Sequence, residues 1–411
     1  MTPCPTRPRV ISVVLLTGLM MACSEDSSTS SPPISLLDQM VVSDASVPDQ
    51  SVEMDAQRSD AAMTTDAQSP GLIMDSATPM ADASLDGSVG PRPGPDQTIT
   101  GFDDEHVFFG GENRREVDAV VNFPDLSLAY EEVIMRFRLK CPPDGGCDWW
   151  DRKGWLGLVL NPGTEDESVV ELWRFITPYR VAADWTYDMT DLRSLLAGEV
   201  QLRVFIDTWV GPGHSNGAGW LVDVDFEFKG GVPERVPLAV IPVWTARTFE
   251  YGNPELPTET VYSESITLPE GVNYGSLRLL ITGHGQGNAE NCAEFCPKQH
   301  HVVIEEREFT ERIWRDDCAT SAVQGQYGTY TYPRAGWCPG AYVRPWTVDV
   351  SEQVAGKAEI SLAYGVERYK NTCRPEEPRC RGCVFDTGCE YNDTNHTRPN
   401  YLFSGLLTVY R

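Results

Sequence analysis

The sequence predicts an all-β protein whose folded part holds two domains, each a sandwich or barrel of short strands. From about residue 102 onward, Trp, Tyr, Phe and Val become frequent, whereas the preceding stretch is polar. Short runs of alternating or β-branched residues recur there, separated by turn residues such as Asn161-Pro-Gly and Gly230-Gly231. Many short strands at this spacing are typical of sandwiches and barrels. The roughly 310 residues involved are enough for two ordinary domains.

The N-terminus has the features of an export signal rather than of a folded element. Arg7 and Arg9 precede an apolar run over 10–21, which is too short to span a membrane. The run ends in Met-Met-Ala-Cys23, which resembles a bacterial lipobox with methionine in place of the usual leucine. We therefore expect a lipoprotein signal peptide at 1–22 and a lipidated Cys23 that anchors the exported protein to the bacterial cell envelope, at the outer membrane or cell surface. The alternative is an ordinary secretory signal cleaved nearby.

Residues 23–100 are expected to form a disordered acidic tether rich in Ser, Asp, Pro and Ala. Positions 24–100 contain no aromatic residue and no cysteine, and they hold 13 acidic residues against two arginines. Such a segment cannot bury enough apolar surface to fold, and its charge keeps it extended. It carries a large part of the formal net charge of −27, and this acidity argues against nucleic acid as a partner.

We expect the first β-domain to cover 101–234 and the second to cover 235–411. Strands are predicted in the first domain at 106–109, 117–122, 132–139, 156–160, 169–176, 200–209 and 220–228. Strands are predicted in the second domain at 238–244, 265–268, 277–282, 301–306, 359–364 and 401–410. The single expected helix, over 190–197, opens at an Asp or Thr cap and closes at Gly198. A disulfide-rich insertion is expected over 370–398.

Cysteine usage also indicates export. Once Cys4 in the leader and Cys23 are set aside, ten cysteines remain, an even number that predicts five disulfides in an oxidising compartment. The sequence alone does not fix the pairing. Proximity favours Cys141 with Cys147, Cys292 with Cys296, and Cys318 with Cys338. The remaining four, which we expect to pair among themselves, are Cys373, Cys380, Cys383 and Cys389.

The first candidate site residue is a carboxylate beside the short loop that Cys141 and Cys147 would close. Asp151 directly follows Trp150 and precedes Arg152. A fixed carboxylate next to aromatic rings suits a polar, sugar-like substrate, because the acid can transfer protons while the rings stack on apolar sugar faces. We interpret Asp151 as a catalytic acid or base, with Trp150 and Arg152 as substrate-binding neighbours. The alternative is an exposed Asp–Arg pair, which contributes little to stability.

Two further carboxylates occur later in the chain. Glu294 lies between Cys292 and Cys296, so a short disulfide loop would hold it in one orientation. Asp207 ends a strong predicted strand, where the alternative is an aspartate that faces solvent. We expect these acids to meet Asp151 in a cleft between the domains. Repulsion and desolvation would then raise their pKa values, so that one could act as an acid and another as a base.

A cation and a ring lie together in the glycine-rich turn Arg334-Ala-Gly-Trp337. They could hold a developing negative charge or a sugar hydroxyl. The alternative is a disulfide-closed turn with Trp337 in the core.

A metal site is the competing interpretation of the spacing Cys292-x3-Cys296-x3-His300-His301. An even number of exported cysteines favours a disulfide there, with His300 as a packing or hydrogen-bonding residue. The sequence also lacks a nucleophile elbow, a phosphate loop, a dinucleotide fingerprint and a His-Glu-x-x-His motif. We therefore expect neither a metal nor a cofactor.

Several blocks between residues 130 and 345 together resemble one known family. In order, they are Cys-x5-Cys-Asp-x-Trp150-Asp151-Arg152, Arg174-Phe-Ile-Thr-Pro-Tyr179, Asp188-x-Thr-Asp-x-x-Ser-Leu-Leu-x-Gly198, Thr208-Trp209, Cys292-Ala-Glu294-x-Cys296 and Arg334-Ala-Gly-Trp-Cys-Pro-Gly340. Their order and spacing are similar to those of the peptide-N-glycosidase F family, bacterial amidases that remove N-linked glycans from asparagine. The resemblance implies two adjacent jelly-roll β-sandwich domains with the site at their interface.

The resemblance also implies roles for individual residues. Asp151 would be the principal catalytic residue, Glu294 an essential carboxylate across the cleft, and Arg334 a substrate-binding cation. The three disulfides favoured by proximity are those that the family would have. Asp207 would be the third catalytic carboxylate, although the family has a glutamate there, which is one methylene longer.

Other departures fall where the family binds sugar. Phe295 and His284 stand where the family has tryptophan, and we expect them to contact substrate together with Trp209 and Trp337. These positions shape the sugar subsites, so the departures bear on glycan preference and on activity itself.

The resemblance implies an amidase that cleaves between asparagine and the first GlcNAc of N-glycans, leaving aspartate and releasing a glycosylamine. We expect a monomer that acts on N-glycosylated proteins or peptides and meets the membrane only through its lipid anchor. A non-catalytic surface protein that binds glycans or proteins on the same scaffold is the first alternative. The others are a glycosidase that cleaves between sugars and a copper-dependent monooxygenase, for which the six histidines show no two-copper pattern.

Overall fold

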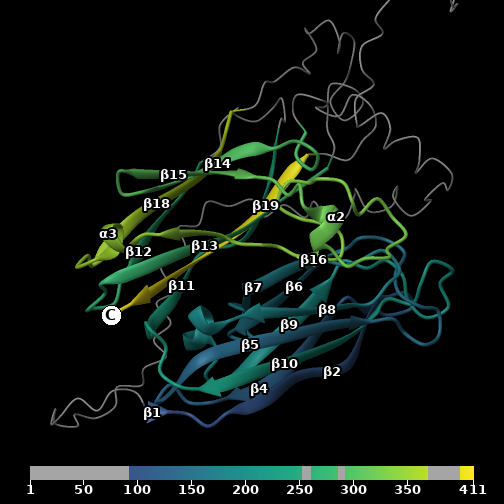
Figure 1. The fold of residues 1–411 in the computed structure, drawn as a ribbon, viewed down its shortest axis with the longest axis horizontal. Helices are drawn as coiled ribbons and strands as arrows, with labels where there is room; N and C mark the ends of the chain where they lie inside the picture. Colours follow the sequence, from purple (N-terminus) through teal and green to yellow (C-terminus); the bar gives the residue numbers. More distant parts are fainter. Residues whose placement is uncertain (1–91, 252–260, 286–291, 369–398) are drawn as a thin grey trace, which may run out of the picture. The chain divides into compact units, whose positions relative to one another are not determined.

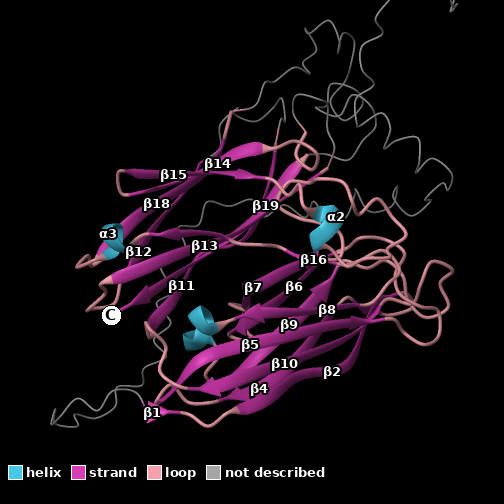
Figure 2. Ribbon diagram, in the orientation of Figure 1, coloured by secondary structure: helices cyan, strands magenta, loops and turns pink. Residues whose placement is uncertain are grey.

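The structure, a computed structural model, describes residues 92–251, 261–285, 292–368 and 399–411. All of them belong to one unit of the chain, Asp66–Arg411. Within these ranges four sheets form two β-sandwiches, and helices are few and short (Figures 1 and 2). The predicted all-β class is therefore confirmed. No helix in the described part of the chain is long and apolar enough to cross a membrane.

The first sandwich packs a sheet of order β1-β5-β10-β2-β3, with β8 paired to β5, against a sheet of order β16-β7-β6-β9-β4. Its strands are β1 (Arg92–Pro93), β2 (Gln97–Phe109), β3 (Asn113–Arg114), β4 (Glu116–Phe123), β5 (Leu128–Lys140), β6 (Lys153–Leu160), β7 (Ser168–Ile176), β8 (Ala183–Asp188), β9 (Gly198–Ile206), β10 (Trp220–Gly230) and β16 (Ala341–Tyr342).

Alternation along β5 shows why these residues form half of a sandwich. Met135, Phe137 and Leu139 are fully buried, whereas Arg136 and Arg138 between them face outward. Successive side chains of a strand point to opposite faces, so this pattern turns one apolar face toward the opposite sheet. Burial of each such side chain contributes about 1.5–3 kcal/mol.

The second sandwich packs a sheet of order β11-β19-β13-β17 against a sheet of order β12-β18-β14-β15. Its strands are β11 (Pro237–Glu250), β12 (Val261–Thr267), β13 (Tyr274–His284), β14 (Lys298–Ile304), β15 (Arg307–Ile313), β17 (Trp346–Asp349), β18 (Glu359–Val366) and β19 (Asn400–Tyr410). The helices are the 3-10 turn η2 (Thr190–Leu195), α2 (Cys318–Ser321) and α3 (Ser351–Val354).

Strands β13 and β19 are buried almost continuously, because their outer faces pack against the first sandwich. At this interface Arg174 of β7 forms a doubly hydrogen-bonded ion pair with Glu171, both bonds being 2.6 Å. Arg174 Nη1 also donates to Thr282 Oγ1 at 3.0 Å and to the Leu402 carbonyl at 2.8 Å. Ser404 Oγ donates to Glu171 at 2.6 Å. A fully hydrogen-bonded buried ion pair therefore holds the two sandwiches in register.

Every predicted strand overlaps an observed one, but shorter elements were missed. The strands that were not predicted are β1, β3, β8, β15, β16 and β17. The expected helix over 190–197 is a 3-10 turn that ends at Leu195. The expected Asp or Thr cap is wrong, because the residue at the N-cap is Met189, which makes no side-chain cap bond. Asp188, one position earlier, accepts from the backbone N–H of Thr190 at 2.8 Å. The first described strands, β1 and β2, begin before residue 101.

The chain also crosses between the predicted domains. Strand β16 comes from the range 235–411, yet Ala341 pairs with Ile176 of β7 in the first sandwich, beside which it lies in Figure 1. The expected signal peptide, Cys23, most of the tether, and the insertion over 370–398 with its four cysteines lie outside the described residues.

Candidate active site

A cleft of about 200 Å³ lies where the two sandwiches meet, and it brings six of the predicted site residues together. Its lining residues are Asp151, Arg152, Lys153, Ile176, Asp207, His284, Glu294 and Trp337. Lys153 and Ile176 were not predicted. The predicted substrate-binding residues that do not line this cleft are Trp150, Trp209, Phe295 and Arg334.

A buried aspartate, Asp148, fixes the loop that carries Asp151. Asp148 is fully buried, and it accepts hydrogen bonds from the Trp150 backbone N–H at 3.0 Å and from Thr208 Oγ1 at 2.7 Å. Arg152 Nε donates to it at 3.0 Å. The ion-pair partner of Arg152 is therefore Asp148, and not Asp151 as the alternative of an exposed Asp–Arg pair would require. Charge-assisted bonds of this kind are strong and directional, so Asp148 holds its neighbours rigidly.

Asp151 faces the cleft in surroundings that disfavour its charge. Burial raises the pKa of Asp151, while the charge of Arg334, a hydrogen bond from Tyr179 and the charge of Arg152 act in the opposite direction. Burial also raises the pKa of Tyr179 well above its usual range, and the Asp151 charge adds to this shift. Tyr179 therefore stays a hydroxyl donor beside Asp151. It stands in the motif Arg174-Phe-Ile-Thr-Pro-Tyr179, but nothing in the residues alone singled it out.

Glu294 reaches the cleft from the second sandwich, on the short loop closed by Cys292 and Cys296. Backbone bonds fix the loop: Glu294 N–H donates to the Gly285 carbonyl at 3.0 Å, and Ala335 N–H donates to the Glu294 carbonyl at 2.8 Å. Burial raises the pKa of Glu294 from 4.5 to about 7; the Arg334 charge opposes this shift and the Asp151 charge adds to it. The carboxyl group is therefore poised to exchange a proton near neutral pH.

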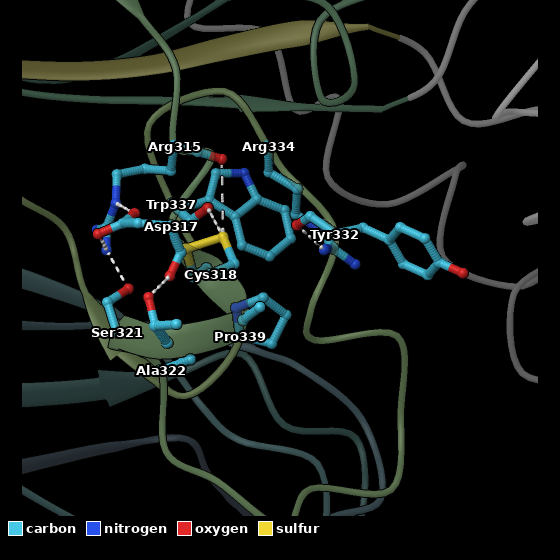
Figure 3. The surroundings of a disulfide bond; sticks show 12 residues. Arg315, Asp317, Cys318, Ser321, Ala322, Tyr332, Arg334, Trp337 and Pro339 are labelled. Carbon is cyan, nitrogen blue, oxygen red and sulfur yellow. Dashed lines mark hydrogen bonds and ion pairs between the residues drawn. A yellow bond between two sulfur atoms is a disulfide. The ribbon is translucent and has the colours of Figure 1, made fainter.

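Arg334 supports Glu294 from behind the cleft wall. It is only 2% exposed, and its Nε donates to Glu294 Oε1 at 3.3 Å. Nη1 donates to the carbonyls of Thr329 at 3.1 Å and Tyr332 at 3.0 Å, which orients the guanidinium as Figure 3 shows for Tyr332. The rings of Phe295 and Trp337 lie 5.3 and 4.9 Å from its guanidinium carbon. In this structure Arg334 therefore pairs with Glu294, and the Phe295 ring packs against the Arg334 guanidinium.

The disulfide between Cys318 and Cys338 closes the turn that carries these residues (Figure 3). Gly336 adopts a φ of +83°, and a Cβ there would lie 2.3 Å from the Ile281 carbonyl oxygen. Only glycine therefore allows the turn to approach β13 this closely. The approach lets Trp337 Nε1 donate to the Gly283 carbonyl at 2.7 Å. Trp337 is 4% exposed, so it is both a packed residue and a wall of the cleft.

Asp207 is the third carboxylate of the cleft, and two cations accompany it. Arg115 Nη1 lies 3.4 Å from Asp207 Oδ1, and Lys153 Nζ lies 3.9 Å from Oδ2. The guanidinium of Arg115 also covers the ring of Trp209 at 4.2 Å, and that ring packs against Phe109. The Asp207 side chain is 29% exposed, whereas the Glu294 side chain that pairs with Arg334 is 18% exposed. Asp207 is therefore the more open of these two carboxylates.

His284 forms the opposite wall, stacked on Trp337 with ring centroids 5.4 Å apart. Its Nε2 lies 2.8 Å from Thr282 Oγ1, which also accepts from Arg174. Burial and the nearby charges of Lys153 and Arg174 hold the pKa of His284 well below its usual range. It is therefore a neutral imidazole at neutral pH.

The three disulfides favoured by proximity are all present in the structure. The thiolate–imidazole metal site is excluded, because Cys292 and Cys296 are bonded to each other. His300 is fully buried, and its Nδ1 lies 2.7 Å from the Tyr364 hydroxyl, which is the packing role we expected. Within the described ranges no group of His, Cys, Asp and Glu side chains is arranged to hold a metal ion.

The fold and the cleft define a double β-sandwich protein with an acid–base site shared between its two halves. Comparison with known proteins agrees with this description. The family profile "Peptide-N-glycosidase F, N terminal" matches residues 148–218, and "Peptide-N-glycosidase F, C terminal" matches residues 253–378.

Individual relatives match over most of their length. Peptide-N(4)-(N-acetyl-beta-D-glucosaminyl)asparagine amidase F of Elizabethkingia miricola is 28% identical over 315 residues, which cover 72% of this chain and 85% of the relative. The solved structure of PNGase F, a glycosylasparaginase from Flavobacterium meningosepticum, aligns with a TM-score of 0.61 at 23% identity, covering 77% of this chain and 96% of the other. PNGF-II aligns with a TM-score of 0.53 at 14% identity, covering 76% and 65%. The chain belongs to the peptide-N-glycosidase F family, and its two sandwiches are that family's jelly rolls.

Proposed function

We propose that the protein is an amidase that hydrolyses the bond between an asparagine side chain and the first GlcNAc of an N-glycan on glycoproteins or glycopeptides. The similarity to an asparagine amidase supports this reaction class. The observation that carries it is the meeting of Asp151 and Glu294, one from each sandwich, in one cleft with both pKa values raised. Amide hydrolysis needs a group that accepts a proton from water and a group that protonates the departing nitrogen.

The pKa values suggest how the two carboxyl groups divide the work. Glu294, with a pKa of about 7, is partly protonated at neutral pH and can donate its proton to the departing nitrogen. Arg334 then stabilises the carboxylate that remains, because its Nε already lies 3.3 Å from Oε1. Asp151 polarises the attacking water or holds the first sugar.

The bonds balance as an ordinary hydrolysis. The water oxygen bonds to the side-chain carbonyl carbon, and the carbon–nitrogen bond breaks. The nitrogen takes a proton and leaves with the sugar as a glycosylamine, which decays to free glycan in water. The peptide keeps an aspartate, and no metal or cofactor takes part in these steps.

Mass spectrometry of the formerly glycosylated peptide tests the proposal. Residues 92–411 are incubated with a denatured N-glycoprotein, and the asparagine should gain the mass of an amide-to-acid conversion. Asp151→Asn should give no product, whereas Asp144→Asn, on the exposed part of the loop closed by Cys141 and Cys147, should match the wild type. Peptide that retains a single GlcNAc would mean a glycosidase. Glycopeptide that is bound but unchanged would favour the non-catalytic glycan-binding alternative.

We also propose that Cys23 carries a lipid and that the protein acts as an exported monomer on the bacterial cell envelope. The apolar run before Cys23 and the acidic tether after it support this proposal. Labelling of cells with radioactive palmitate should mark the full chain, and Cys23→Ser should lose the label. A label that persists in this variant would contradict the anchor, and a dimer in light scattering would contradict the monomer.

A further inference from the structure

An unpaired arginine lies between aromatic rings beside the cleft. The guanidinium carbon of Arg180 is 3.5 Å from the ring centroid of Trp149 and 5.3 Å from that of Tyr327. Among the residues that the structure describes, no carboxylate pairs with Arg180, and no side-chain hydrogen bond satisfies its guanidinium. Its Nε is buried without a partner. Such a group is costly unless a ligand completes its hydrogen bonds.

The backbone of Arg180 is held in a rare conformation. Its φ of +63° lies in the left-handed region, which disfavours residues with a Cβ. Its N–H donates to the Asp148 carbonyl at 3.1 Å, and the Trp149 N–H donates to the Asn216 carbonyl at the same distance. Strained residues persist where the surrounding structure fixes them, and they cluster at ligand sites.

Tyr327 is the most exposed part of this group, yet both of its neighbours are anchored. Its residue exposure is 74%. Gln326 Oε1 accepts from the Tyr179 N–H at 3.0 Å, and Gln326 Nε2 donates to the Pro339 carbonyl at 2.9 Å. A Cβ on Gly328 would lie 2.4 Å from the Tyr179 ring, so the chain there rests directly on that ring. The exposed ring is therefore presented on a fixed backbone, at low entropic cost for a ligand that stacks on it.

This group shares its supports with the cleft. Trp149 lies two residues before Asp151, and Arg180 follows Tyr179, whose hydroxyl bonds Asp151. A substrate held at Asp151 would therefore extend close to these three side chains. Trp149, Arg180 and Tyr327 are not among the residues that line the cleft, so they offer a separate surface.

We infer that Trp149, Arg180 and Tyr327 form a second subsite, which binds a carboxylate carried by the glycoconjugate substrate. An arginine fork pairs with carboxylates through two hydrogen bonds, and the rings supply faces for stacking. A chain with a formal net charge of −27 repels acidic ligands in general, so a local unpaired cation gives such a ligand one place to bind. The carboxylate can belong to an acidic sugar at the end of the glycan or to an Asp or Glu beside the glycosylated asparagine. The choice of carrier rests on the proposed function.

Calorimetric titration of the Asp151→Asn variant tests this subsite without turnover. One pair of ligands is a sialylated N-glycopeptide and its desialylated form; the other is a neutral-glycan peptide with Glu or Gln beside the asparagine. We expect the acidic member of one pair to bind about tenfold more tightly than its neutral partner, as one charge-assisted contact implies. The pair that shows the difference identifies the source of the carboxylate.

Variants of the group separate its parts. Arg180→Gln should abolish the acidic preference, and Tyr327→Ala, at an exposed position that folding does not need, should weaken both members of a pair. Arg307→Gln is the matched control, because Arg307 lies 5.7 Å over the Phe309 ring on β15 and does not line the cleft. The inference would be overturned if the two members of each pair bound with equal affinity or if the acidic members did not bind. It would also be overturned if the preference for the acidic member survived in Arg180→Gln. Turnover of the neutral glycopeptide by the wild type decides the amidase assignment separately.

Discussion

Glu294→Gln tests the electrostatics of the cleft with almost no change of volume. The pKa of Glu294 is raised from 4.5 to about 7, first by burial and further by the charge of Asp151. Between these two values the folded protein keeps the proton, whereas the unfolded chain has released it. The folded state therefore binds more protons in this window, and the free energy of unfolding falls as the pH rises through it. From pH 5 to pH 8 this shift lowers wild-type stability by about 2.5 kcal/mol.

Glutamine cannot ionise, so the stability of the variant should not fall with pH for this reason. Urea unfolding of the wild type and Glu294→Gln at pH 5 and pH 8 should show the variant gaining about 2.5 kcal/mol relative to the wild type at the higher pH. Glu306→Gln, in the exposed turn between β14 and β15, is the control for loss of a carboxylate elsewhere. A stability difference that is the same at both pH values would refute the raised pKa, and with it the assignment of Glu294 as the proton donor.

Three further changes test other parts of the site. Asp151→Asn should abolish product formation and leave the melting temperature nearly unchanged; activity in this variant would contradict its role. Asp148→Ala leaves Arg152 without its buried partner, so it should cost about 3 kcal/mol in urea unfolding and lower kcat by tenfold or more, because Asp151 loses its fixed position. Glu171→Gln breaks the interface pair with Arg174 and should cost about 3–5 kcal/mol. An unfolding midpoint equal to that of the wild type would show that this pair does not hold the sandwiches together.

The strands could be predicted because burial follows their sequence pattern. Alternation marked β5, and a largely apolar run marked β19, which the neighbouring sandwich covers on its outer face. Strand β15 carries mostly exposed residues and so gave no such pattern. Strand β16 has only two residues, and its pairing with β7 depends on the fold of the turn around Cys338. Local sequence holds no information about that contact.

The site residues could be predicted where neighbouring residues in the sequence mark them, and not where their role depends on contacts between distant segments. The cysteines around Glu294 and the rings before Asp151 marked both carboxylates. The sequence did not reveal the partner of Arg152, because Asp148, three positions before Asp151, is buried by folding and accepts the Arg152 hydrogen bond. Arg334 lies behind the cleft wall and acts through Glu294, which depends on how two distant turns pack. Tyr179 could be identified only from the structure, because folding places its hydroxyl beside Asp151.

Hydrolysis in ¹⁸O-labelled water is the most direct test of amidase chemistry at the cleft. A defined N-glycopeptide is treated with residues 92–411, and the peptide product is sequenced by mass spectrometry. Attack of water on the side-chain carbonyl predicts one ¹⁸O in the side chain of the new aspartate, and none with Asp151→Asn. The released glycan is not diagnostic, because the glycosylamine also exchanges with water. A product peptide that keeps its first GlcNAc, or one without ¹⁸O at the aspartate, would contradict hydrolysis of the amide.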